Sequence, residues 1–292
     1  MARTPLFTCL TVISAVLIST SCSKSNALII GSKNFTEQNI LAEIIAQHVE
    51  RKLAVPVQRR FNLGGTLLAH QSVTTGAIDL YPEYTGTALL AILKQDPLAE
   101  AATTLEKVRQ EYSRLNVEWL PPLGFNNSFA MVIPGDLARN RQIEKLSDAP
   151  KYSEWQLGMG YEFSERKDGY ANLVSSYGIK QKSAPRSMDL GLLYKALEQN
   201  QVNMIAANMT DGMLAKMDVK VLEDDKRIFP PYEACIVVRS EALRTFPELR
   251  STLEQLSGKI SGDKMRNLNY MADVEHKPLR EIAAAFLTEA GL

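Results

Sequence analysis

The sequence has few of the residues that carry nucleophilic, redox or metal chemistry. Its 292 residues include three histidines and three cysteines. No cysteine or second histidine stands at the spacing of a zinc site. The sequence also lacks a Gly-x-Ser-x-Gly elbow and a glycine loop that ends in Gly-Lys-Ser/Thr. We therefore expect no metal, no cofactor and no enzymatic activity.

Neither sign of charge predominates. Lysine and arginine total 33, as do aspartate and glutamate, and no basic stripe with interleaved aromatic residues is present. Nucleic acid is therefore not an expected partner.

The N-terminal segment is typical of export. Arg3 is followed by an uncharged, largely apolar stretch from Thr4 to Ser21, which is short for a membrane span and suits a cleavable signal peptide over residues 1–22. The small residues before Cys22 resemble a lipobox, although Ser19 stands where leucine is usual. We expect an extracytoplasmic protein, in the periplasm or at the cell surface, that is anchored to a bacterial membrane through a lipid on Cys22.

After the signal no second long apolar run occurs, and one thiol remains. Cys235 lies in the apolar segment Glu-Ala-Cys-Ile-Val-Val, so we expect it to be buried in a strand. With Cys9 removed and Cys22 modified, no intrachain disulfide can form. The fold must then depend on its apolar core.

The chain after the signal alternates short apolar strands with helical patterns, which predicts an α/β fold with a largely parallel sheet. Its length favours two lobes. Two apolar strands beside proline, Ala130–Ile133 before Pro134 and Ala234–Val238 after Pro231, are the candidate crossings. We assign lobe 1 to residues 27–132 plus 235–292 and lobe 2 to residues 133–234. Two crossings leave a ligand cleft between the lobes.

Several aromatic residues stand at turns beside strand ends and not on helical apolar stripes. They are Tyr81, Tyr84, Phe129, Tyr161, Tyr170, Tyr194 and Tyr232. A quaternary ammonium cannot donate a conventional hydrogen bond, so proteins hold it with aromatic faces, each contributing about 1 kcal/mol or more when desolvated. Packing in the core explains each single ring equally well. The acids Asp79 and Glu83 flank two of these tyrosines and are candidates to attract a cation.

Seven segments together resemble the substrate-binding proteins of osmoprotectant ABC importers, the glycine betaine, carnitine and choline group. They are GSKNFTEQ (31–38), NLGGT (62–66), GAIDLYPEYTGT (76–87), GFNNSFA (124–130), RSMDLGLLYKA (186–196), NMTDG (208–212) and LEDDKRIFPPY (222–232). They occur in the family's order and cover essentially the whole mature chain.

This resemblance implies a two-lobed type II periplasmic-binding fold that captures a quaternary ammonium solute and delivers it to an ABC permease with its ATPase. The motifs place Tyr84, Phe129, Tyr194 and Tyr232 in an aromatic cage, with Tyr161 as a further candidate. For the polar end of the ligand, residues at helix starts are expected to contribute, namely Ser32, Thr36, Asn39, Thr66 and Thr87.

Two positions differ from the family pattern, and two alternatives stay open. Phe129 stands where many relatives carry tyrosine or tryptophan, and Asn208 replaces a more usual tyrosine or serine. Family members with related cages also bind ergothioneine, which needs a longer pocket. A sensory solute-binding protein on the same scaffold is the other alternative.

Overall fold

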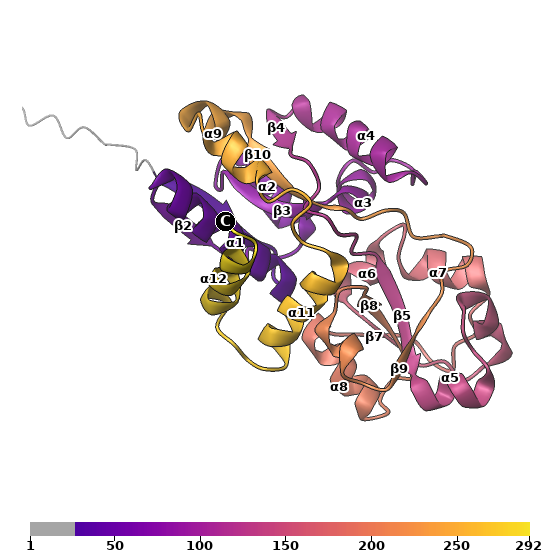
Figure 1. Cartoon of the computed structure of the whole chain (residues 1–292). Coiled ribbons are helices and arrows are strands. Elements are labelled where there is room, and N and C mark those ends of the chain that lie inside the picture. Colours follow the sequence, from indigo (N-terminus) through magenta and orange to yellow (C-terminus); the bar gives the residue numbers. More distant parts are fainter. Residues whose placement is uncertain (1–26) are drawn as a thin grey trace, which may run out of the picture.

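The computed structural model describes residues 27–292, which form two α/β lobes side by side (Figure 1). The expected signal peptide and the expected lipid attachment at Cys22 lie outside the described residues. None of the helices in residues 27–292 is long and apolar enough to cross a membrane.

The first lobe is built on a five-stranded mixed sheet in the order β2-β1-β3-β10-β4. Its strands are β1 (Leu28–Gly31), β2 (Val57–Arg60), β3 (Leu80–Tyr84), β4 (Val117–Trp119) and β10 (Ala234–Arg239). Strand β1 runs parallel to β2 and β3, whereas β10 is antiparallel to β3 and β4. Cys235 of β10 is buried and free, as its apolar context predicts.

The second lobe has a five-stranded sheet in the order β7-β6-β8-β5-β9. Its strands are β5 (Phe129–Pro134), β6 (Leu157–Met159), β7 (Arg186–Ser187), β8 (Met204–Asn208) and β9 (Val219–Leu222). Strand β6 runs parallel to β7 and β8, and β5 is antiparallel to β8 and β9. In each sheet, therefore, one antiparallel strand begins directly after a crossing between the lobes.

The first crossing lies earlier in the chain than expected. The boundary assigned at residues 132–133 falls inside β5, and β5 pairs with β8 and β9 from its first residue. The chain thus leaves the first sheet after β4 and enters the second at Phe129. The apolar run 129–134 is buried because it is a central strand of lobe 2, not because it is a connection. The return passage lies between β9 and β10.

Helices cover both sheets. In the first lobe they are α1 (Thr36–Leu53), α2 (Thr66–Thr75), α3 (Thr85–Thr87) continued by a π-helical turn (Ala88–Ile92), α4 (Ala101–Ser113), α9 (Ser240–Thr245), α10 (Leu249–Glu254), α11 (Gly262–Asp273) and α12 (Leu279–Glu289). In the second they are α5 (Gly135–Arg141), α6 (Tyr161–Glu165), α7 (Tyr170–Tyr177) and α8 (Leu193–Glu198), with 3-10 turns at Leu146–Lys151, Leu190–Leu192 and Gly212–Ala215.

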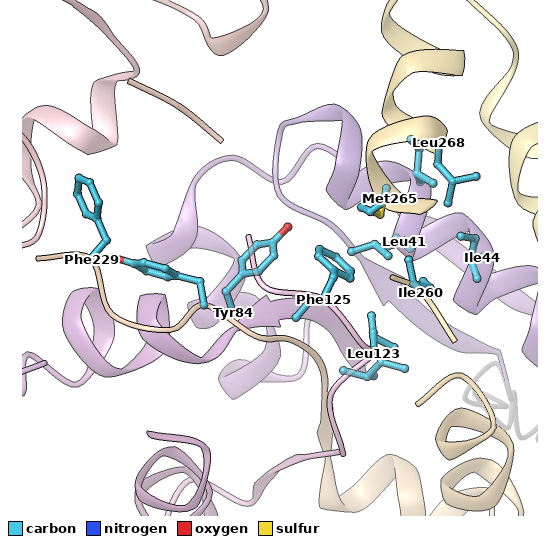
Figure 2. Packing of buried hydrophobic residues seen from close by; sticks show 14 of the residues in the cluster. Leu41, Ile44, Tyr84, Leu123, Phe125, Phe229, Ile260, Met265 and Leu268 are labelled. Atoms are coloured by element: carbon cyan, nitrogen blue, oxygen red, sulfur yellow. The ribbon is translucent and has the colours of Figure 1, made fainter. Parts of the chain in front are cut away.

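Helix α1 is the centre of the first lobe's core. It is buried along most of its length, and α10, α11 and α12 pack against it. Figure 2 shows Leu41 of α1 near Met265 and Leu268 of α11, all members of one buried cluster. Helix α11 also contacts the 3-10 turn Gly212–Ala215 of the second lobe, so the C-terminal helices join both lobes.

We predict that Leu41→Ala lowers the free energy of unfolding by about 2–5 kcal/mol, because the substitution removes a side chain that is 1% exposed and leaves a cavity. Leu67→Ala is the matched control, since that leucine is 64% exposed, and a change within about 0.5 kcal/mol is expected. Urea unfolding followed by circular dichroism measures both. Equal losses in the two variants would contradict the assigned core.

Candidate functional site

A cavity of about 810 Å³ lies between the two lobes. Residues at or just after the carboxyl ends of β1, β3, β6 and β8 line it, among them Lys33, Tyr84, Gly160 and Asn208. The carboxyl edges of largely parallel sheets are where α/β proteins place their ligand sites. The cavity is therefore the candidate binding site.

Most of the residues predicted from the sequence line this cavity. They are Tyr84, Phe129, Tyr161, Tyr194, Tyr232, Thr36, Thr66 and Thr87. Tyr161 lies at the rim, with 60% of its surface exposed. The other members of this group are more deeply placed, so most of the segments singled out in the sequence do meet in space.

Ser32 and Asn39 do not line the cavity. The Ser32 hydroxyl donates to Asn39 Oδ1 at 2.6 Å and accepts from the Asn62 amide at 3.0 Å. Asn39 Nδ2 in turn donates to Asn62 Oδ1 at 2.9 Å. These bonds fix the turn after β1 against the segment that follows β2. In this structure Ser32 and Asn39 thus support the turn, and the structure does not place them on the cavity lining expected from the sequence.

The aromatic residues form two separate groups and not one closed box. Phe129 is the hub of the first, with its ring centroid 4.7 Å from Phe163 and 5.6 Å from both Phe229 and Tyr232. Tyr84 belongs to a second group and stacks on Phe35 at 6.4 Å. Figure 2 shows Tyr84 and Phe229 within the buried cluster.

Glu37, on the first turn of α1, is a cavity-lining acid that sequence reasoning missed. Its carboxylate accepts hydrogen bonds from Tyr84 Oη and Thr210 Oγ1, each at 2.5 Å, from Asn127 Nδ2 at 2.8 Å and from Asn269 Nδ2 at 3.0 Å. Burial raises the pKa of Glu37, although these four donors oppose the shift. All four donors are neutral groups.

Asp211 and Asp273 place two more carboxylates on the cavity wall. Asp211 accepts from Tyr194 Oη and from the Asn208 amide, both at 3.1 Å, and burial raises its pKa to about 7. Asp273 accepts from Thr36 Oγ1 at 2.6 Å, and burial raises its pKa too. This part of the cavity is suited to attract a cation.

Three cationic residues that the sequence analysis did not select also line the cavity, namely Lys33, Arg166 and the exposed Lys195. Lys33 Nζ lies 2.5 Å from Glu83 Oε1, both side chains being buried. Arg166 forms two hydrogen bonds to Asp168, at 2.9 and 2.6 Å. Its guanidinium carbon lies 5.3 Å from the ring centroid of Phe129.

Asp79 and Glu83, which were expected to attract a cationic ligand, face cationic side chains of the protein instead. Glu83 pairs with Lys33, and Asp79 accepts from Arg239 at 3.2 Å and from the Ile29 amide at 2.8 Å. Neither lines the cavity. The acids that do so include Glu37 at the start of α1, Asp211 in the turn after β8 and Asp273 at the end of α11, and no spacing in the sequence marks them. Within residues 27–292, no group of three or more metal-ligating side chains is assembled.

Two α/β lobes around a ligand cavity define a solute-binding protein of the type II periplasmic class, and solved structures confirm this fold. A crystal structure titled glycine betaine/carnitine/choline ABC transporter superposes with a TM-score of 0.77 and 30% identity, covering 90% of this chain and 98% of that one. Apo YehZ from Escherichia coli superposes with a TM-score of 0.69 and 28% sequence identity, and the match covers 91% of this chain and 99% of that one.

The family described as the substrate binding domain of ABC-type glycine betaine transport systems matches residues 26–289, and the chain belongs to this family. It is 36% identical to the ergothioneine transport permease/binding protein EgtU of Helicobacter pylori, over 94% of this chain but about half (50%) of that protein. It is 32% identical to the carnitine transport binding protein OpuCC of Listeria monocytogenes, over 97% of this chain and 94% of that protein. The sequence-based recognition is thus confirmed.

We predict that Asp211 contributes stability that is lost as the pH rises from about 4 towards 7. Its pKa is higher in the folded state, about 7, than its ordinary 3.8, so the folded state binds more protons in this range. Asp211→Asn should make the decline shallower. Urea unfolding at several pH values measures how the free energy of unfolding changes with pH. Asp263→Asn is the control, because the Asp263 side chain is 92% exposed. An unchanged slope in Asp211→Asn argues against the assignment.

Proposed function

We propose that the chain is the extracytoplasmic receptor of an ABC importer and binds a quaternary ammonium solute, such as glycine betaine, choline or carnitine, in the interlobe cavity. The observation that carries this proposal is the pairing of aromatic rings with carboxylates on the cavity lining: Tyr84 with Glu37 from the first lobe, and Tyr194 with Asp211 from the second. An onium is attracted by aromatic faces and by negative charge but makes no conventional hydrogen bond. Anionic solutes are repelled by these carboxylates.

The hydrogen bonds around Glu37 favour the further proposal that binding and lobe closure are linked. Tyr84 and Asn269 reach Glu37 from the first lobe, whereas Thr210 reaches it from the second. A cation that settles beside this carboxylate stabilises the arrangement in which both lobes contact it. The closed, liganded form would then deliver the solute to the permease by a population shift. This role requires no catalysis and no cofactor.

A longer trimethylammonium compound, ergothioneine, is the second candidate. The cavity volume of about 810 Å³ lies in the upper part of the range of ligand pockets, roughly 300–1,000 Å³. The relative that is 36% identical is named for ergothioneine. We further propose that the protein is held at the outer face of a bacterial membrane by a lipid on Cys22, which places the receptor near its permease.

We predict that Phe129→Leu weakens onium binding by about 1–2 kcal/mol, because leucine retains much of the apolar volume but has no aromatic face. Isothermal titration with choline, glycine betaine, carnitine and ergothioneine measures the loss. Phe286→Leu is the control, since Phe286 is a buried phenylalanine, 3% exposed, that lies in α12 outside the cavity. If no member of the panel binds to the folded wild-type protein, the proposed function is wrong.

A further inference from the structure

A protein carboxylate occupies the N-terminus of α2 at the mouth of the cavity. Glu162 Oε1 accepts a hydrogen bond from the Thr66 amide at 2.7 Å, and Glu162 Oε2 accepts from Thr66 Oγ1 at 3.1 Å. Thr66 is the first residue of α2, a ten-residue helix, where the free N–H groups and the helix dipole favour an anion. Thr66 is buried, while Glu162 is solvent-exposed.

The local sequence gives this carboxylate the space that it needs. A Cβ atom on Gly65 would lie 2.1 Å from Glu162 Oε1, closer than any side chain permits. Lys33 Nζ donates to Thr66 Oγ1 at 3.2 Å, so a cation lies directly behind the threonine. The backbone N–H and the hydroxyl of Thr66 thus converge on one position, which we call the Thr66 seat, and the Lys33 ammonium supports the hydroxyl from behind.

The occupant of the Thr66 seat comes from the opposite lobe. Glu162 is in α6 of the second lobe, whereas Thr66 and Lys33 belong to the first. Of the three cationic residues that line the cavity, Lys33 faces Glu83 and Arg166 faces Asp168, while Lys195 is exposed. By contrast, the hydrogen bonds described for Glu37 come from neutral donors only.

We propose that Glu162 is a specificity-determining residue that fills the seat of a ligand carboxylate, so that the cavity prefers an onium without a carboxylate, such as choline, over glycine betaine. This inference rests on the proposed function. A ligand carboxylate must either approach Glu162 against like-charge repulsion or displace it and break both of its bonds to Thr66. Specificity of this kind arises from an unfavourable contact with the wrong ligand.

The test uses two ligands that share the trimethylammonium group and differ at the other end. Choline carries a hydroxymethyl group where glycine betaine carries a carboxylate. Isothermal titration should show the wild-type protein binding choline at least about tenfold more tightly. In Glu162→Gln, which retains the shape but removes the charge, the choline-to-betaine affinity ratio should shift towards glycine betaine by about tenfold or more.

Glu165→Gln is the matched control, because Glu165 lies on the same helix and is exposed but does not line the cavity. It should leave the ratio unchanged. If Glu162→Gln weakens both ligands by the same factor, Glu162 only holds the lobes together and the specificity role is overturned. A wild-type preference for glycine betaine also overturns it, as does tight binding of ergothioneine, which carries a carboxylate, without binding of choline. If the folded protein binds no onium at all, the proposed function itself is wrong.

Discussion

The buried carboxylate of Glu37 is the constraint on which the interlobe geometry depends. An ionised group without partners is very unfavourable in a protein interior, so its donors must be held in place. They come from the end of β3, from the first crossing, from the loop after β8 and from α11, as Tyr84, Asn127, Thr210 and Asn269. Four separate segments are thereby positioned around one group, and the same group faces the cavity.

The rings of the predicted cage are near cationic groups of the protein itself. The Arg166 guanidinium carbon lies 5.3 Å from the Phe129 centroid and 5.8 Å from that of Tyr232, and Lys33 Nζ lies 5.2 Å from the Tyr84 centroid. Aromatic faces that attract an onium attract these side chains by the same physics. Asp168 and Glu83 hold the two cations, which limits how far either can move into the cavity.

Local sequence signals predicted the layers, because the alternation of strands and helices is a local feature. The positions of Tyr84 and Tyr232 on the cavity lining were predicted by the resemblance to the family and not by local pattern alone. Long-range pairing was the part that could not be predicted. A buried apolar strand such as β5 has the same sequence pattern in either lobe. Only its pairing with β8 and β9 shows that it belongs to the second lobe. Likewise, Glu37 and Glu83 both lie in recognised motifs, but only the folded chain shows that Lys33 pairs with Glu83 and leaves Glu37 to the cavity.

The two crossings are joined to each other, and this explains why aromatic residues stand beside them. The Tyr232 amide donates to Asn126 Oδ1 at 2.7 Å, the Asn127 amide donates to the Tyr232 carbonyl at 3.0 Å, and Asn126 forms a β-bridge with Glu233. Displacement in a hinge rotation grows with distance from the axis. Phe129 and Tyr232 adjoin this bridge in the chain, so a rotation about it would move them little. Thr66 and Glu162 belong to opposite lobes, so the same rotation would separate them and break their contact.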